Sequence, residues 1–173
     1  MAGLLLPAET GWDQALDWGR RAEAAGARHL WVDDGAGPVP LVAGLLRRLG
    51  LRVGLVVRPI RRTPAVLAKE VNSLDVIGGG RLELAAYREE GAEATLALVA
   101  ALADGEPRAV PGSDPAAPAA RCLPASVQRP HPPLWYAEPG WPDEGSGPAG
   151  GPPSWAPEGW AEAGLAGVSL VAR

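Results

Sequence analysis

The sequence predicts an α/β protein built on a parallel sheet. Over the first hundred residues, apolar runs of strand length alternate with helical patterns, which is typical of repeated strand–helix units. The run 51–57 is apolar almost throughout, as expected of a parallel strand that is covered on both faces. Six stretches have strand character, so we expect about six parallel strands joined by right-handed crossovers.

The first elements follow from residue type and spacing. Thr10 can cap a helix, with Asp13 three residues further on. Pro40 can begin a second helix, because a proline at the first helical position loses no hydrogen bond. We therefore expect strands at residues 3–8, 29–32 and 51–57, and helices at residues 10–26 and 40–50.

The clearest joint between a helix and a strand lies at residues 63–87. A Thr-Pro pair at 63–64 marks a helix start, and apolar residues then recur at helical spacing. Three glycines at 78–80 end the helix, because glycine enters the left-handed region without steric cost. The alternation that begins at Arg81 predicts a strand, and the Ala- and Leu-rich stretch 90–102 predicts the next helix.

The composition changes after this fourth helix. Residues 106–133 are rich in Pro and Ala and predict a long connection without a helix. A short strand at 134–137 completes the predicted core, which spans residues 1–137. Residues 138–157 are dense in Gly and Pro, which predicts a flexible loop. In the segment 158–173, which belongs to the same domain, we expect a short helix at 158–163 and a last strand at 167–172.

Charge and cysteine content limit the partners and the kinds of site. The net charge of −4 over 173 residues is unlike the basic footprint of a nucleic-acid-binding protein. No stretch predicts a membrane-spanning helix, so we expect a cytoplasmic protein that binds neither nucleic acid nor membrane. Cys122 is the one cysteine, so an internal disulfide cannot form; we expect an exposed thiol and no metal site.

Three stretches form a pattern along the chain. They read EAAGARHLWVDD at 23–34, LAKEVNSLDVIGGGRLELAAY at 67–87 and VQRPHPPLW at 127–135. In this order they resemble the luciferase-like flavin-dependent monooxygenases, whose fold is a (β/α) barrel of the TIM type. Such a barrel needs about 250 residues. The resemblance therefore implies a shortened, incomplete barrel.

Asp33 and Asp34 end the second predicted strand, at the edge where parallel β/α folds carry their chemistry. Two carboxylates there can act as a base or orient a ligand; alternatively, both begin a loop and are solvated. The resemblance adds that this strand commonly ends in Asp-His, with the His in the active site. Asp34 matches the Asp and is the candidate catalytic residue. Gly35 stands where the His would be, so a general base is lost.

The resemblance also implies a place for the cofactor, which is FMN or the deazaflavin F420. Residues 54–57 correspond to a strand that lies against the flavin ring, and Ala85 replaces a family glycine at the end of the next strand. Tyr87 narrows the space that such glycines leave open. The alternative for these side chains is a plain apolar core. The implied cofactor-binding positions are Gly54, Val56, Val57 and Ala85.

Arginines follow the third predicted strand, at positions 58, 61 and 62. Arginine binds phosphate oxygens with two parallel hydrogen bonds, so this group can receive a phosphate. The alternative is a solvated face or pairing with nearby glutamates. Arg62 also matches a family Arg-x-Pro that leads into the third helix, which implies a structural role, and Arg81 is expected to be structural too.

Two functions stay open on the sequence. In the first, the chain is a flavin-dependent oxidoreductase or monooxygenase that acts on a small organic substrate, and its cofactor supplies the difficult chemistry. In the second, it is a flavin-binding or structural subunit without turnover, descended from the same family. An incomplete barrel leaves sheet edges uncovered, so a homodimer or a partner subunit is expected in either case.

Overall fold

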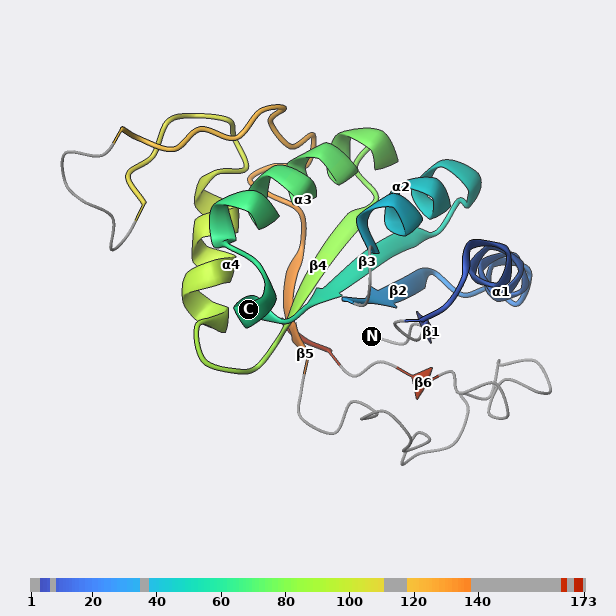
Figure 1. Cartoon of the computed structure of the whole chain (residues 1–173). Helices are drawn as coiled ribbons and strands as arrows, with labels where there is room; N and C mark the ends of the chain where they lie inside the picture. Colours follow the sequence, from blue (N-terminus) through green and yellow to red (C-terminus); the bar gives the residue numbers. More distant parts are fainter. Residues whose placement is uncertain are drawn as a thin grey trace.

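The computed structural model describes residues 4–6, 9–34, 38–110, 118–137, 166–167 and 170–172. One sheet lies at the centre, and four helices lie along one side of it (Figure 1). Strands and helices alternate up to the fifth strand, as predicted. The strands are β1 Leu4–Leu6, β2 His29–Asp33, β3 Arg52–Val57, β4 Leu82–Tyr87, β5 Leu134–Ala137, β6 Ala166–Gly167 and β7 Leu170–Ala172. The helices are α1 Trp12–Ala24, α2 Pro38–Arg48, α3 Pro64–Gly78 and α4 Ala92–Ala101, with a 3₁₀ turn η1 at Pro59–Arg61.

The α/β fold with a parallel sheet is confirmed. Strands β1 to β5 pair in chain order and all four pairings are parallel. The prediction of a sixth parallel strand at 167–172 is wrong. That stretch contributes two short pieces, and both are antiparallel: β6 pairs with β1, and β7 pairs with β5.

The two C-terminal pieces require a curved sheet. Gly167 pairs with Leu4 at one edge of the sheet, and Leu170 pairs with Ala137 at the other. Three residues of chain reach at most about 11 Å. In a flat sheet, six strand spacings would instead separate β6 from β7 by about 29 Å. The five parallel strands therefore form a partial barrel.

The joint between α3 and β4 forms as the glycines predict. Gly79 has a φ of 60°, in the left-handed region, and its N–H bonds to the carbonyl of Val76. The guanidinium of Arg81 then donates to the carbonyls of Leu46, Leu49, Leu51 and Gly78, which ties the ends of α2 and α3 together. The structural role expected for Arg81 is confirmed. The cap of α1 is different from the prediction: Gly11, not Thr10, is the N-cap residue.

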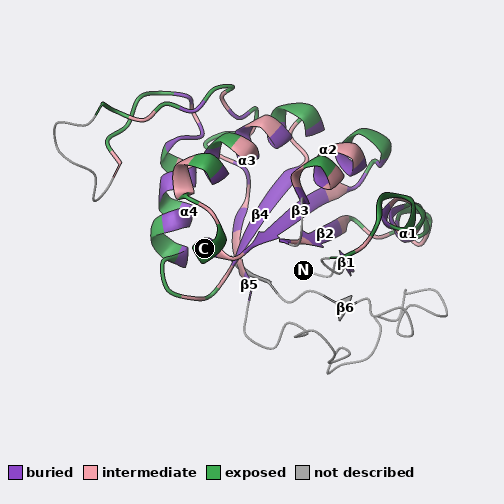
Figure 2. Cartoon of the chain, viewed as in Figure 1, coloured by how far each residue is buried: buried purple, intermediate pink, exposed green. Residues whose placement is uncertain are grey.

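Side-chain alternation divides the sheet into an outer and an inner face. The outer face packs against all four helices and forms the large core. The inner face carries a smaller buried cluster, to which each of the five parallel strands contributes and no helix does. Both faces of the central strands are buried, as Figure 2 shows. We call this second group the inner cluster; its buried members are Leu5, Trp31, Val56, Ala85 and Ala137, with Tyr87 and Trp135 packed against it.

The long connection after α4 has no helix over its described residues, as predicted, and a buried carboxylate anchors it. Asp75 on α3 accepts hydrogen bonds from the Ser126 hydroxyl at 2.5 Å and from the Val127 and Gln128 backbone N–H groups at 2.9 Å each. Cys122, in the same segment, corrects the expectation of an exposed thiol. It is buried against α3, and this burial raises the pKa of the thiol.

Three predictions lie outside the described residues: the flexible loop at 138–157, the helix at 158–163 and the replacement of a histidine by Gly35. Within the described ranges, none of the helices has the length and apolar character that crossing a membrane requires.

Gly54 gives a test of how tightly the inner face is packed. A Cβ at this position would lie 2.0 Å from the ring of Trp31, which is itself buried. We expect Gly54→Ala to lower the free energy of unfolding by about 2–3 kcal/mol through overpacking, measured by urea denaturation. The control is Gly11→Ala, where a Cβ meets nothing within 4 Å. Its cost should stay below about 1 kcal/mol, the size of a helix-cap effect. Equal losses in the two variants would contradict the packing of Trp31 on Gly54.

Candidate functional site at the carboxyl ends of the strands

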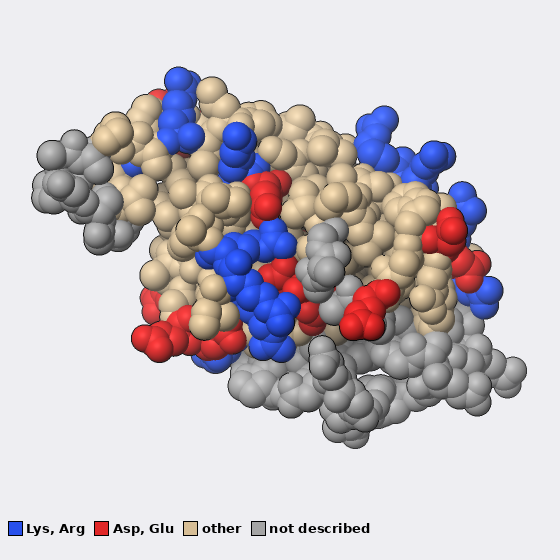
Figure 3. All heavy atoms as spheres, in the orientation of Figure 1, with Lys and Arg blue, Asp and Glu red and all other residues tan. Residues whose placement is uncertain are grey.

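Polar side chains gather where β2, β3 and β4 end. In parallel β/α folds, ligands bind at this edge, because the loops that follow the strands meet there. Asp33 ends β2 and Asp34 follows it, Arg58 follows β3, and Tyr87 ends β4. Figure 3 shows basic side chains grouped beside acidic ones on this side of the molecule. The residues fall into two separate sets of contacts.

The first set holds the loop after β3 in place through Asp34. Asp34 is 2% exposed, so the alternative of a solvated aspartate is wrong for this residue. Its carboxylate pairs with the guanidinium of Arg62 at 2.6 Å, and Arg62 also pairs with Glu70 on α3. Burial lowers the pKa of Arg62, but the hydrogen bonds and charges of the two carboxylates outweigh it, and the net shift is upward. Asp34 is therefore held in an ion pair.

Of the other two arginines in this loop, one contacts a backbone carbonyl and the other a carboxylate. Arg61 donates to the backbone carbonyl of Asp34 at 2.6 Å, and its side chain is otherwise exposed. Arg58 lies 3.8 Å from the carboxylate of Glu89, with both side chains about one-third exposed. The expected pairing with glutamates is thus confirmed for Arg58 and Arg62, as is the structural role of Arg62.

The second set joins Asp33, Tyr87 and Arg58. The Tyr87 hydroxyl donates a hydrogen bond to the Asp33 carboxylate, and the Arg58 guanidinium lies 4.3 Å from the centre of the Tyr87 ring. Each of these residues was a candidate from the sequence, but no contact between them was predicted. Strand alternation carried the signal: Trp31 and Asp33, Val56 and Arg58, and Ala85 and Tyr87 are each two residues apart and face the same side.

The predicted cofactor positions lie on two faces. Val56 and Ala85 are register partners in β3 and β4, and both belong to the inner cluster. Gly54 faces the same side, but the ring of Trp31 covers it. Val57 packs in the outer core among the helices, so only its backbone is near the inner face. The structure thus brings Val56 and Ala85 together at the carboxyl end and separates them from Val57.

A further polar cluster lies on the inner face towards the amino ends of the strands. Glu83, 2% exposed, accepts hydrogen bonds from Arg52 at 2.5 Å and from the Trp135 indole N–H at 3.0 Å, and His29 lies 3.4 Å away. Burial lowers the pKa of His29, partly offset by the charge of Glu83. Because Arg52 already neutralises Glu83, a proton on His29 would leave an excess positive charge in this cluster.

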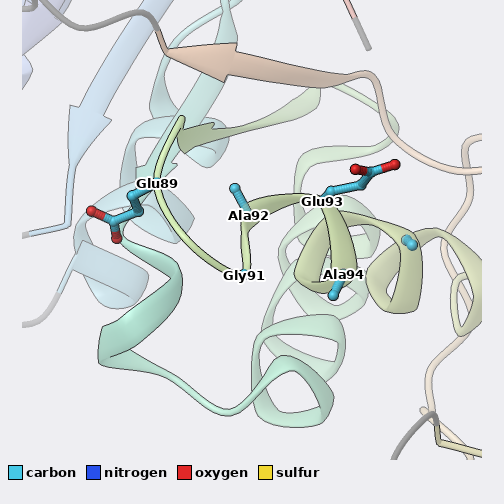
Figure 4. Close-up of a pocket in the computed structure, with 6 residues that line it drawn as sticks. Glu89, Gly91, Ala92, Glu93 and Ala94 are labelled. Carbon is cyan, nitrogen blue, oxygen red and sulfur yellow. The ribbon is translucent and has the colours of Figure 1, made fainter.

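One hollow, of about 550 Å³, lies at the start of α4 (Figure 4). Small residues line it together with Glu89 and Glu93, whose carboxylates point away from each other. Carboxylates that diverge in this way do not form a paired acid–base site. Over the described residues, no group of three or more His, Cys, Asp or Glu side chains could hold a metal ion.

The ion pair of Asp34 predicts a loss of stability when its carboxylate is removed. We expect Asp34→Ala to lower the free energy of unfolding by about 2 kcal/mol; that is less than a fully isolated buried charge costs, because Glu70 still faces Arg62. The control is Asp17→Ala, which removes a pair whose side chains are 61% and 52% exposed. Its cost should stay within about 0.5 kcal/mol. A loss in Asp34→Ala no larger than in this control would show that the buried pair is not structural.

His29 predicts a pH dependence of stability. Its pKa in the folded chain is below the reference value of 6.5, so the unfolded chain takes up the proton first as the pH falls. The contribution of neutral His29 to the free energy of unfolding is therefore fully present above pH 6.5. It is lost as the pH falls from there to the lowered pKa. Urea denaturation at pH 7.5 and pH 5.5 measures the decrease, and His29→Asn should reduce it. An identical decrease in both proteins would rule out His29 as its source.

Comparison with known proteins shows which family the chain is similar to. The luciferase-like monooxygenase family matches residues 2–93, which is more than half of the chain. No curated protein gives a match. Among solved structures, monooxygenase RslO1 from Streptomyces bottropensis has a TM-score of 0.64 at 23% identity, covering 77% of this chain and 50% of that one.

Two further structures have the same fold. The coenzyme F420-dependent tetrahydromethanopterin reductase from Methanopyrus kandleri has a TM-score of 0.65 at 16% identity, covering 78% of this chain and 49% of that one. The oxygenating constituent of 3,6-diketocamphane monooxygenase from Pseudomonas putida, solved with FMN, has a TM-score of 0.51 at 17% identity, covering 62% and 41%. The chain spans about half the length of the first two structures. The match over residues 2–93 and the common fold show that the chain belongs to the luciferase-like monooxygenase family.

Proposed function

We propose that the chain takes part in a flavin-dependent oxidation or monooxygenation of a small organic substrate. The observation that carries this proposal is the position of Asp33, Arg58 and Tyr87 at the carboxyl ends of strands that lie within the family match. Carboxylate, guanidinium and phenol groups at this edge can orient a polar organic molecule. FMN or F420 is the proposed cofactor, since one similar structure is F420-dependent and another was solved with FMN.

Two residues of the inner face suit a flavin ring, whereas a third lies where the ring would bind. Val56 and Ala85 form a small apolar wall, which suits a planar ring. However, the Tyr87 phenol packs against the inner cluster that contains these two residues, and its hydroxyl donates a hydrogen bond to Asp33. In this arrangement the phenol competes with a flavin ring for the apolar wall. A bound flavin would supply the electrons for the oxidation, and the chain's part would be to bind and orient.

The surroundings of Asp34 favour a positioning role over the catalytic role that the resemblance implies. A carboxylate in a buried ion pair with Arg62 is not available to take a proton from a substrate. We therefore assign it a positioning role, because it holds Arg61 and Arg62 behind the site. Asp33 has Tyr87 as its hydrogen-bond partner and is only partly buried, so it is the better candidate for contact with a substrate.

The alternative is a subunit of the same family without turnover. It is favoured by the commitment of Asp34 to Arg62 and by the position of Tyr87 on the apolar wall. Such a subunit would work with a second copy or a partner chain. A homodimer or a partner subunit is also part of the first proposal, because β1 and β5 are each covered by only a short antiparallel piece.

A titration of the purified protein tests the proposed function. Fluorescence should show saturable binding of FMN or F420, oxidised or reduced, below about 1 mM, with a stoichiometry near one to one. The absorbance spectrum of the freshly purified protein gives a second readout, since a retained flavin is yellow. Failure of all four ligand forms to bind would remove the first proposal and leave the subunit without turnover.

A further inference from the structure

We propose that Tyr87 is a displaceable plug, whose phenol ring occupies the place of a planar ligand ring and must swing away before a flavin can bind. This inference rests on the proposed function, because it concerns how the same site accepts its cofactor. It concerns one side chain and the apolar wall beneath it, formed by Val56 and Ala85.

The position of the ring follows from the strand order. Tyr87 ends β4, Asp33 ends β2, and β3 lies between these strands. The hydrogen bond from the Tyr87 hydroxyl to Asp33 therefore carries the side chain across β3. Tyr87 also packs against the inner cluster, which contains Val56 of β3 and Ala85 of β4. The ring thus lies across the wall on which a planar ligand would stack.

Contacts of three kinds help to hold the ring in this position. The Tyr87 hydroxyl donates a hydrogen bond to Asp33, and the ring packs against the inner cluster. The Arg58 guanidinium lies 4.3 Å from the ring centre. Arg58 is in turn 3.8 Å from Glu89. Apolar, aromatic and charged groups meet in this arrangement much as they would around a bound aromatic ligand. The side chain fills the site with the same kinds of contact that a flavin ring would use.

The surroundings of Tyr87 allow it to move. Tyr87 is only partly buried, and so are Asp33 and Arg58. Water can therefore take over the hydrogen bond to Asp33 and the solvation of Arg58. Tyr87 is also the last residue of β4, and the chain turns directly after it towards Gly91, whose φ is 82°. Displacement would uncover the apolar wall together with Asp33 and Arg58.

The size of the expected effect follows from the fraction of molecules in which the site is open. A ligand that binds only the open form has an apparent Kd equal to its intrinsic Kd divided by that fraction. If the plug is displaced in about one molecule in ten, Tyr87→Ala should lower the apparent Kd about tenfold. The readout is binding itself, so it does not depend on an unknown substrate.

The chain offers a matched control in its second tyrosine. Tyr136 also lies beneath an arginine, with Arg88 4.7 Å from its ring centre, but it packs against the outer core on the opposite face. Fluorescence titrations with FMN and F420 would compare wild type, Tyr87→Ala and Tyr136→Ala, each first checked for a cooperative thermal transition. We expect a Kd about tenfold lower in Tyr87→Ala and an unchanged Kd in Tyr136→Ala.

The outcomes separate this inference from the proposed function. Binding by Tyr87→Ala but not by wild type would support the plug and favour the subunit without turnover. Equal Kd values in wild type and Tyr87→Ala would overturn the plug and leave the proposed function intact. No binding by either protein would overturn both. Equal tightening in Tyr136→Ala would also overturn the plug, since the effect would then be a general loosening.

A second variant keeps the test decisive if Tyr87→Ala does not fold. Tyr87→Phe keeps the packed ring and removes only the hydroxyl that bonds to Asp33. The ring then loses the hydrogen bond to Asp33, so the open fraction rises and the Kd should fall about threefold. An unchanged Kd in a folded Tyr87→Phe would show that the bond to Asp33 does not hold the site closed.

Discussion

Among the residues that the structure describes, no helix packs on the inner face of the five parallel strands, and this is the constraint on which the structure depends. Along β1 to β5, every second side chain faces away from the four helices and has to be buried by its neighbours on the same face. The large ring of Trp31 covers part of this face, and it leaves no room for a side chain at position 54, which is therefore a glycine. Glu83 can be buried nearby because Arg52 and Trp135 bond to it. The curved sheet, the packing of Trp31 and the hydrogen-bonded Glu83 thus all serve to bury the inner face.

At the carboxyl ends the same face opens to solvent, and the balance of interactions changes. Asp34 points into the structure and fixes the loop before α3, whereas its neighbour Asp33 points to the inner face and meets Tyr87. Adjacent residues at the end of a strand face opposite sides, so one carboxylate is used for architecture and the other stays near the site.

Much of the fold could be predicted from the sequence because its signals are local. The glycines after α3 and the apolar run of β3 gave the correct elements, since turn geometry and burial act over a few residues. The ion pair of Asp34 with Arg62 joins residues from two different loops, and the bond of Tyr87 to Asp33 crosses an intervening strand. Strand alternation places Asp33 and Tyr87 on one face, but no local pattern shows that two such residues contact each other. The antiparallel direction of the last strand pieces was missed for the same reason, because pairing direction depends on the path of the chain in space.

The pairing of the C-terminal pieces with β1 and β5 has a consequence for how the molecule folds. Leu4 and Gly167 are partners although roughly 160 residues separate them along the chain, and contacts of such long range slow folding. β1 is synthesised before residues 166–167, so the edge that pairs with them stays unpaired until they have emerged from the ribosome. During that interval its exposed N–H and C=O groups are a template for association with other chains. The pairing of β1 is therefore completed only after the other four parallel strands have been made.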